Sequence, residues 1–62
     1  LRDALGEARL ALADGHADRA RRLLEEVVRA HPDRAEAYLA LADAHRRLGR
    51  WPEAAAALAR AA

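Results

Sequence analysis

The sequence predicts an all-α protein, and three observations carry this prediction. Most of the 62 residues are Ala, Arg, Leu or Glu, which favour the helical backbone. Strand-forming residues are scarce, since the chain has two Val and no Ile, Thr or Phe, and no segment alternates regularly between apolar and polar residues. Gly15, Pro32 and Gly49 divide the chain into four segments. We therefore expect four antiparallel helices.

The segments before and after Gly15 are expected to form the first two helices. Gly15 suits the left-handed backbone that follows a helix end, and Pro32 follows the second segment. In both segments the apolar residues recur three or four positions apart, as on one helix face. These stripes are Leu1, Ala4, Leu5, Ala8 and Leu12, then Ala20, Leu23, Leu24, Val27 and Val28.

The third and fourth helices are expected on either side of Gly49. The sequence Asp33-Arg34-Ala35-Glu36 resembles a capping box, in which the Asp33 carboxylate accepts hydrogen bonds from backbone N–H groups. Pro52 fits the first turn of the fourth helix, where its missing N–H group costs nothing. The apolar stripes are Tyr38, Leu41, Ala42, His45 and Leu48, then Ala54, Ala55, Leu58, Ala61 and Ala62.

Charged residues stand four apart on the remaining helix faces, where they can form weak ion pairs. We expect most of them to form a solvated surface. The pairs are Asp18 with Arg22, Arg21 with Glu25, Glu25 with Arg29, and Asp43 with Arg47.

The composition leaves little chemistry for catalysis or for cofactors. The chain has no Ser, Thr, Cys or Lys, which removes the usual nucleophiles, disulfides and Cys-ligated zinc. His16, His31 and His45 include no pair four residues apart, so we expect no metal site, and we expect His45 to be a packing residue with satisfied hydrogen bonds. We expect neither an enzyme nor a cofactor.

Charge and hydropathy likewise argue against nucleic acid and membrane as partners. The formal net charge is only +1, and no apolar run approaches the length of a membrane span. The absence of a signal-peptide pattern favours the cytoplasm slightly, and an Ala-, Arg- and Leu-rich composition suggests a bacterial source.

The chain repeats itself at an offset of 34 residues. We expect a single domain over 1–62, with repeat one at 1–34 and repeat two at 35–62, which lacks its closing residues and a capping helix. The matching pairs are Leu5 and Leu39, Ala8 and Ala42, Gly15 and Gly49, Ala20 and Ala54, and Leu24 and Leu58.

This period and pattern resemble the tetratricopeptide repeat. The resemblance covers the whole chain and implies two tandem helix-turn-helix repeats in a right-handed α-solenoid. The first repeat departs from the family pattern at Ala4, Glu7 and Ala11, and His45 replaces an aromatic residue. Repeat packing is expected at Ala8, Ala20, Leu24, Tyr38, Leu41, Ala42, Trp51, Ala54 and Leu58.

The resemblance also implies a concave groove, lined by the first helix of each repeat, that receives a peptide or helix of a partner. Its Arg and Leu residues suit an apolar segment that carries acidic residues. The chain has neither Lys nor Asn, which excludes the clamp that some members use for a chaperone's carboxylate. The alternative is a solvated Arg-rich face without a ligand. The expected partner-binding residues are Arg2, Leu5, Arg9, Leu12, Leu39, Asp43, Arg46 and Arg47.

We therefore predict a non-catalytic protein–protein interaction module. The alternative is a self-assembly module whose exposed helix faces form a homo-oligomer. Two repeats fall below the number usually needed for a stable array, and nothing in the sequence covers the Ala-rich last helix. We accordingly expect flanking repeats or an oligomer.

Overall fold

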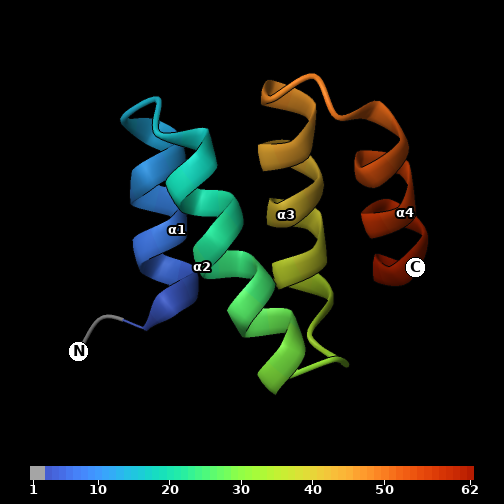
Figure 1. The fold of residues 1–62 in the computed structure, drawn as a ribbon. Coiled ribbons are helices and arrows are strands. Elements are labelled where there is room, and N and C mark those ends of the chain that lie inside the picture. The colour runs from blue at the N-terminus through green and yellow to red at the C-terminus, as the bar shows by residue number, and fades with distance from the viewer. Residues whose placement is uncertain (1–2) are drawn as a thin grey trace.

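The computed structural model describes residues 3–62, which form four helices in a row (Figure 1). Each helix runs antiparallel to the one before it, and no strand occurs in this range. The predicted all-α fold is confirmed. The helices are α1 (Ala4–Ala13), α2 (Ala17–Ala30), α3 (Ala35–Arg47) and α4 (Trp51–Ala61).

The helices form two pairs, and α3 links them. Helix α1 packs against α2, and α3 packs against α4. Helix α3 also packs against α2 and, less extensively, against α1. Within residues 3–62, no helix covers the α3–α4 pair in the way that α3 covers the α1–α2 pair. One apolar face of the second pair is therefore left open.

Both glycine turns have the left-handed backbone that the sequence predicts. The φ angle is 83° at Gly15 and 75° at Gly49. After each glycine the backbone N–H group reaches back to the last helical turn, from His16 to the Ala11 carbonyl at 2.8 Å and from Arg50 to the His45 carbonyl at 2.9 Å. These hydrogen bonds satisfy carbonyl groups that the helix end leaves free. Each turn thereby fixes how one helix of a pair returns along the other.

Two helix starts differ in how they are capped. The predicted Asp33 cap is wrong, because Asp33 lies in the turn, while α3 is capped by Arg34 without a side-chain hydrogen bond. Asp3 instead caps α1, where its Oδ1 accepts a hydrogen bond from the Gly6 N–H group at 2.8 Å. Pro52 does lie in the first turn of α4.

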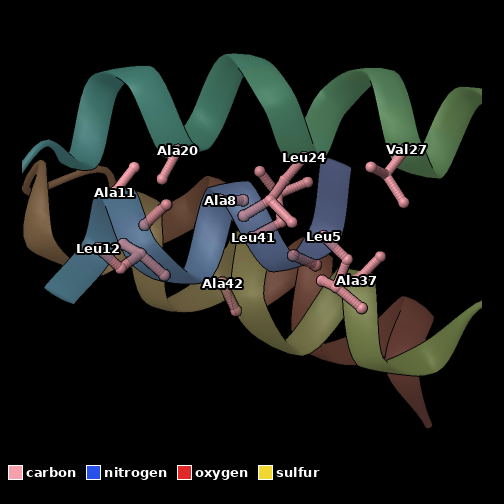
Figure 2. Packing of buried hydrophobic residues seen from close by; sticks show 12 residues of the cluster. Leu5, Ala8, Ala11, Leu12, Ala20, Leu24, Val27, Ala37, Leu41 and Ala42 are labelled. Atoms are coloured by element: carbon pink, nitrogen blue, oxygen red, sulfur yellow. The ribbon is translucent and has the colours of Figure 1, made fainter. Parts of the chain in front are cut away.

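The core lies between the α1–α2 pair and α3. Leu24 is fully buried at its centre, close to Leu5 and Leu41 (Figure 2). Ala8 and Ala20 have no exposed surface, as close approach of α1 and α2 requires. These contacts connect residues from both halves of the chain. Of the expected packing residues, the structure buries Ala8, Ala20, Leu24, Tyr38, Leu41, Ala42 and Ala54.

Two expected packing residues are not buried. Trp51 is 62% exposed and Leu58 is 52% exposed. Their packing role stays a prediction, because no helix within residues 3–62 covers this face of the α3–α4 pair. Because this face is apolar and uncovered within residues 3–62, it is a candidate binding surface.

None of the helices described in residues 3–62 combines the length and the apolar character needed to span a membrane.

Candidate functional site

The expected partner-binding residues do not form one surface. Leu5 and Leu12 are only 4% and 7% exposed, so assigning them to the groove is wrong. They lie on the face of α1 that enters the core, where they contact neighbouring helices instead of solvent. Arg2 lies outside the described residues. The exposed part of the expected groove is therefore limited to polar residues and Leu39.

The arginine residues of the expected groove are engaged with residues of the same chain. Arg46 and Arg47 both donate hydrogen bonds to the Asp43 carboxylate, at 2.6 Å and 3.1 Å. Arg9 pairs with Glu36 at 3.7 Å. Three arginines against two carboxylates leave one net positive charge. Since exposed ion pairs are weak, these side chains can still exchange partners.

Arg47 has a second role between the two helix pairs. Its Nη1 group donates a hydrogen bond to the backbone carbonyl of Leu12 at 2.9 Å. This bond adds a charged donor to a carbonyl in the last turn of α1 that also accepts a hydrogen bond from the Gly15 N–H group at 3.1 Å. Arg47 thus fixes the position of α3 on α1 and is less available to a partner than the sequence implied.

An apolar cleft lies between α3 and α4. It encloses about 220 Å³. Leu39, Trp51 and Leu58 are exposed at this cleft, while Asp43 and Arg46 supply charged groups. The residues that line it are Leu39, Ala42, Asp43, Arg46, Trp51, Ala54, Ala55 and Leu58.

Sequence patterns predict only part of this cleft. Leu39, Asp43 and Arg46 were expected to contact a partner, but Trp51 and Leu58 were assigned to packing and Ala55 to a helix stripe. The 34-residue repeat offset could have indicated that Leu58 is exposed. Leu58 matches Leu24, which needs a covering helix, and residues 3–62 contain no such helix for Leu58.

The described residues show no arrangement that would bind a metal ion. No group of three or more His, Asp or Glu side chains gathers in residues 3–62. His45 is buried, but the expectation that its hydrogen bonds are satisfied is wrong, because its Nδ1 atom has no partner. Its ring fills space in α3 where the family prefers an aromatic residue.

The clear pKa shifts occur at helix surfaces outside the cleft. The hydrogen bond from Gly6, aided by Arg34, lowers the pKa of Asp3. Arg21 lowers the pKa of Asp18, and its own pKa is raised by that carboxylate. Both carboxylates are exposed and paired, as at stabilised helix ends. These shifts therefore indicate helix stabilisation.

A family model described as tetratricopeptide repeat matches residues 5–62, which include all four helices. The chain belongs to the tetratricopeptide repeat family. No curated protein and no solved structure matches this tetratricopeptide repeat chain. Tetratricopeptide repeats generally mediate protein–protein interactions and are typically non-catalytic. The cleft of this tetratricopeptide repeat chain is formed by its last two helices.

Proposed function

We propose that this chain is a non-catalytic protein-binding module whose α3–α4 cleft receives apolar side chains of a partner. One observation carries the proposal. Of the five large apolar residues that are exposed within residues 3–62, Leu39, Trp51 and Leu58 line this one cleft. Burying such a cluster provides the apolar contact area on which protein interfaces depend, and aromatic residues contribute strongly.

The charged residues beside the cleft support a preference for a partner with acidic residues. Asp43 and Arg46 line the cleft, Arg47 pairs with Asp43, and Arg9 pairs with Glu36 on α3. The net positive charge of this group favours an acidic residue next to the apolar anchors. Since the arginines are already paired, we propose that they adjust orientation and association rate more than affinity.

A peptide-display selection tests the proposed cleft. The 62-residue chain is used to enrich binders, which are then measured against a Leu39→Glu variant and a Leu58→Glu variant. Both changes place a carboxylate at an exposed apolar site, so we expect the fold to persist and binding to fall at least tenfold. Leu10→Glu is the matched control, because Leu10 is similarly exposed but lies outside the cleft. Binders that tolerate both cleft substitutions would contradict the proposal.

Charge reversal tests the preference for acidic partners separately. Arg9→Glu and Arg46→Glu should weaken acidic binders and leave neutral binders nearly unchanged. Arg22→Glu is the control, because Arg22 is an exposed α2 residue paired with Asp18. If acidic binders respond equally to all three reversals, the effect is one of overall charge and the local preference is wrong.

The second candidate function is self-association, which the exposure of Trp51 on an apolar face favours. Two copies could bury this face against each other. Sedimentation equilibrium over a dilution series tests this function, and a monomer mass at every concentration would contradict it. Leu58→Glu should abolish any association that does occur.

A further inference from the structure

We infer that a groove between α2 and α4 binds a glutamate-rich segment of a partner protein through Arg29 and Arg60. This groove shares no residue with the α3–α4 cleft, so the inference goes beyond the proposed function and does not depend on it. It follows from two arginines that different helices bring to one groove and that form no ion pair within residues 3–62.

The groove results from the order of the helices. Helices α2 and α4 run in the same direction, and α3 lies between them (Figure 1). Within residues 3–62, α2 and α4 do not pack against each other, and a shallow groove of about 580 Å³ separates them. Tyr38 of α3 lies in this groove, so three helices contribute to one surface. The residues that line it are Glu25, Val28, Arg29, Pro32, Tyr38 and Arg60.

The positive charges of the groove are not neutralised within the described chain. Arg29 and Arg60 are exposed in the last turns of α2 and α4, where a cation stabilises the helix end without using its N–H donors on a carboxylate. The predicted pair of Glu25 with Arg29 does not form within residues 3–62, and Glu25 pairs instead with Arg21 at 2.9 Å. The groove therefore has two charged donors for an anionic partner.

The Arg60 side chain is held in place by an aromatic ring. Its guanidinium carbon lies 5.6 Å from the centroid of the Tyr38 ring, within the range of a cation–π interaction. Tyr38 is only 6% exposed, so the ring is a fixed support. A guanidinium on a ring face keeps N–H groups at its edge for a carboxylate, and it loses less side-chain entropy on binding. Arg60 is therefore positioned before a partner arrives.

The apolar residues of the groove favour glutamate over a simple anion. Val28 is half-buried and Pro32 is exposed, and both line the groove with the two arginines. The methylene groups of a glutamate side chain can contact this apolar surface while its carboxylate accepts two hydrogen bonds from one guanidinium. An inorganic anion would gain only the charge interaction. The occupant is therefore an acidic protein segment.

An NMR titration of the ¹⁵N-labelled 62-residue chain tests the inference. The probe is a hexaglutamate peptide, acetylated and amidated at its ends, and the arginine Nε–Hε signals are recorded at constant ionic strength. We expect saturable shifts at Arg29 and Arg60 that exceed the shift at Arg46, whose guanidinium already pairs with Asp43. Hexaglutamine, the uncharged match of the probe, should cause no such shifts. Equal shifts with hexaglutamine, or shifts centred on Arg46, would overturn the inference.

Two double variants separate a local site from overall charge. Arg29→Gln with Arg60→Gln should weaken hexaglutamate binding at least about fivefold, because two charge-assisted contacts are lost. Arg19→Gln with Arg50→Gln is the matched control, since it removes the same charge from two exposed arginines that lie outside the groove and form no ion pair within residues 3–62. Circular dichroism checks that both variants keep their helices. Equal weakening by the two double variants would overturn the inference.

A competition experiment distinguishes a protein segment from a simple anion. Sodium phosphate is added to the hexaglutamate complex and compared with sodium chloride at the same ionic strength. We expect the two salts to displace the peptide equally, because both act by screening exposed charges. Displacement by phosphate well beyond that by chloride would identify a general phosphate site and overturn the inference.

Discussion

Truncating Leu24 and Leu58 in turn should give very different losses of stability, although the two leucines hold the same place in their repeats. Leu24 is fully buried in the core between α1, α2 and α3, and Leu58 is half exposed. Replacing a buried leucine with alanine costs about 2–5 kcal/mol, because apolar contact is lost and a cavity remains. Surface substitutions usually change stability by less than about 0.5 kcal/mol. We therefore expect Leu24→Ala to cost several times as much as Leu58→Ala.

The loss is large relative to the stability of so small a chain. At about 0.05–0.15 kcal/mol per residue, 62 residues provide roughly 3–9 kcal/mol. Leu24→Ala should therefore remove a large part of the stability or unfold the chain. Urea denaturation followed by circular dichroism at 222 nm measures both variants against the parent chain. If the two midpoints fall by the same amount, the two leucines are equally covered and the unequal burial of the repeats is refuted.

Three further predictions concern single features of the fold. The pKa of Asp3 is lowered first by the hydrogen bond from the Gly6 N–H group and then by Arg34. The ionised Asp3 carboxylate therefore stabilises the fold above its unfolded pKa near 3.8, and this stabilisation is lost as the pH falls through the lower folded pKa. Asp3→Asn should shrink this acid-dependent loss, as measured by thermal unfolding between pH 2 and 5, and an unchanged profile would exclude Asp3 as its source. Gly49→Ala should cost about 1–2 kcal/mol, because alanine is strained at a φ of 75° even though the space around it is open; a chain as stable as the parent in urea would count against this reasoning. His45→Phe should raise stability by roughly 1 kcal/mol, because it removes the buried Nδ1 acceptor that lacks a partner, and a lower unfolding midpoint would show that the ring nitrogens are needed.

The sequence predicted the helices well because local signals determine them. Gly15 and Gly49 terminate helices through a backbone conformation that only glycine adopts without strain, and Pro52 marks a helix start. The Asp33 cap failed for a local reason as well. Helix α3 begins after Arg34, one residue later than the Asp33 motif implied, so the Asp33 carboxylate is not at the helix start.

Burial was harder to predict because it depends on which helix lies opposite. Leu5 and Leu12 have the spacing of a helix face, but spacing alone does not say whether that face meets solvent or α3. Trp51 and Leu58 show the reverse case, because the family pattern expects them to pack against a following helix and residues 3–62 contain none, so both are exposed. The hydrogen bond from Arg47 to the Leu12 carbonyl joins residues 35 positions apart, and no periodic pattern in the sequence predicts such a pair.

The α3–α4 cleft shows both the local pattern that a sequence reveals and the burial that it does not. Its apolar residues were visible in the sequence as one half of a repeat, and their exposure became visible only in three dimensions. At the 34-residue offset, Leu24 is buried and Leu58 is half exposed, because no helix covers the second pair within residues 3–62.

The most direct test of the proposed binding cleft is an NMR titration of the ¹⁵N-labelled 62-residue chain with an unlabelled peptide selected by display. We predict that the largest shift changes occur at the Trp51 indole N–H group and at the backbone amides of Leu39 and Leu58, and that they saturate together. The amides of Leu10 and Arg19 on the opposite end of the helix row should change little. Changes centred on α1 and α2, or none at the cleft, would contradict the account.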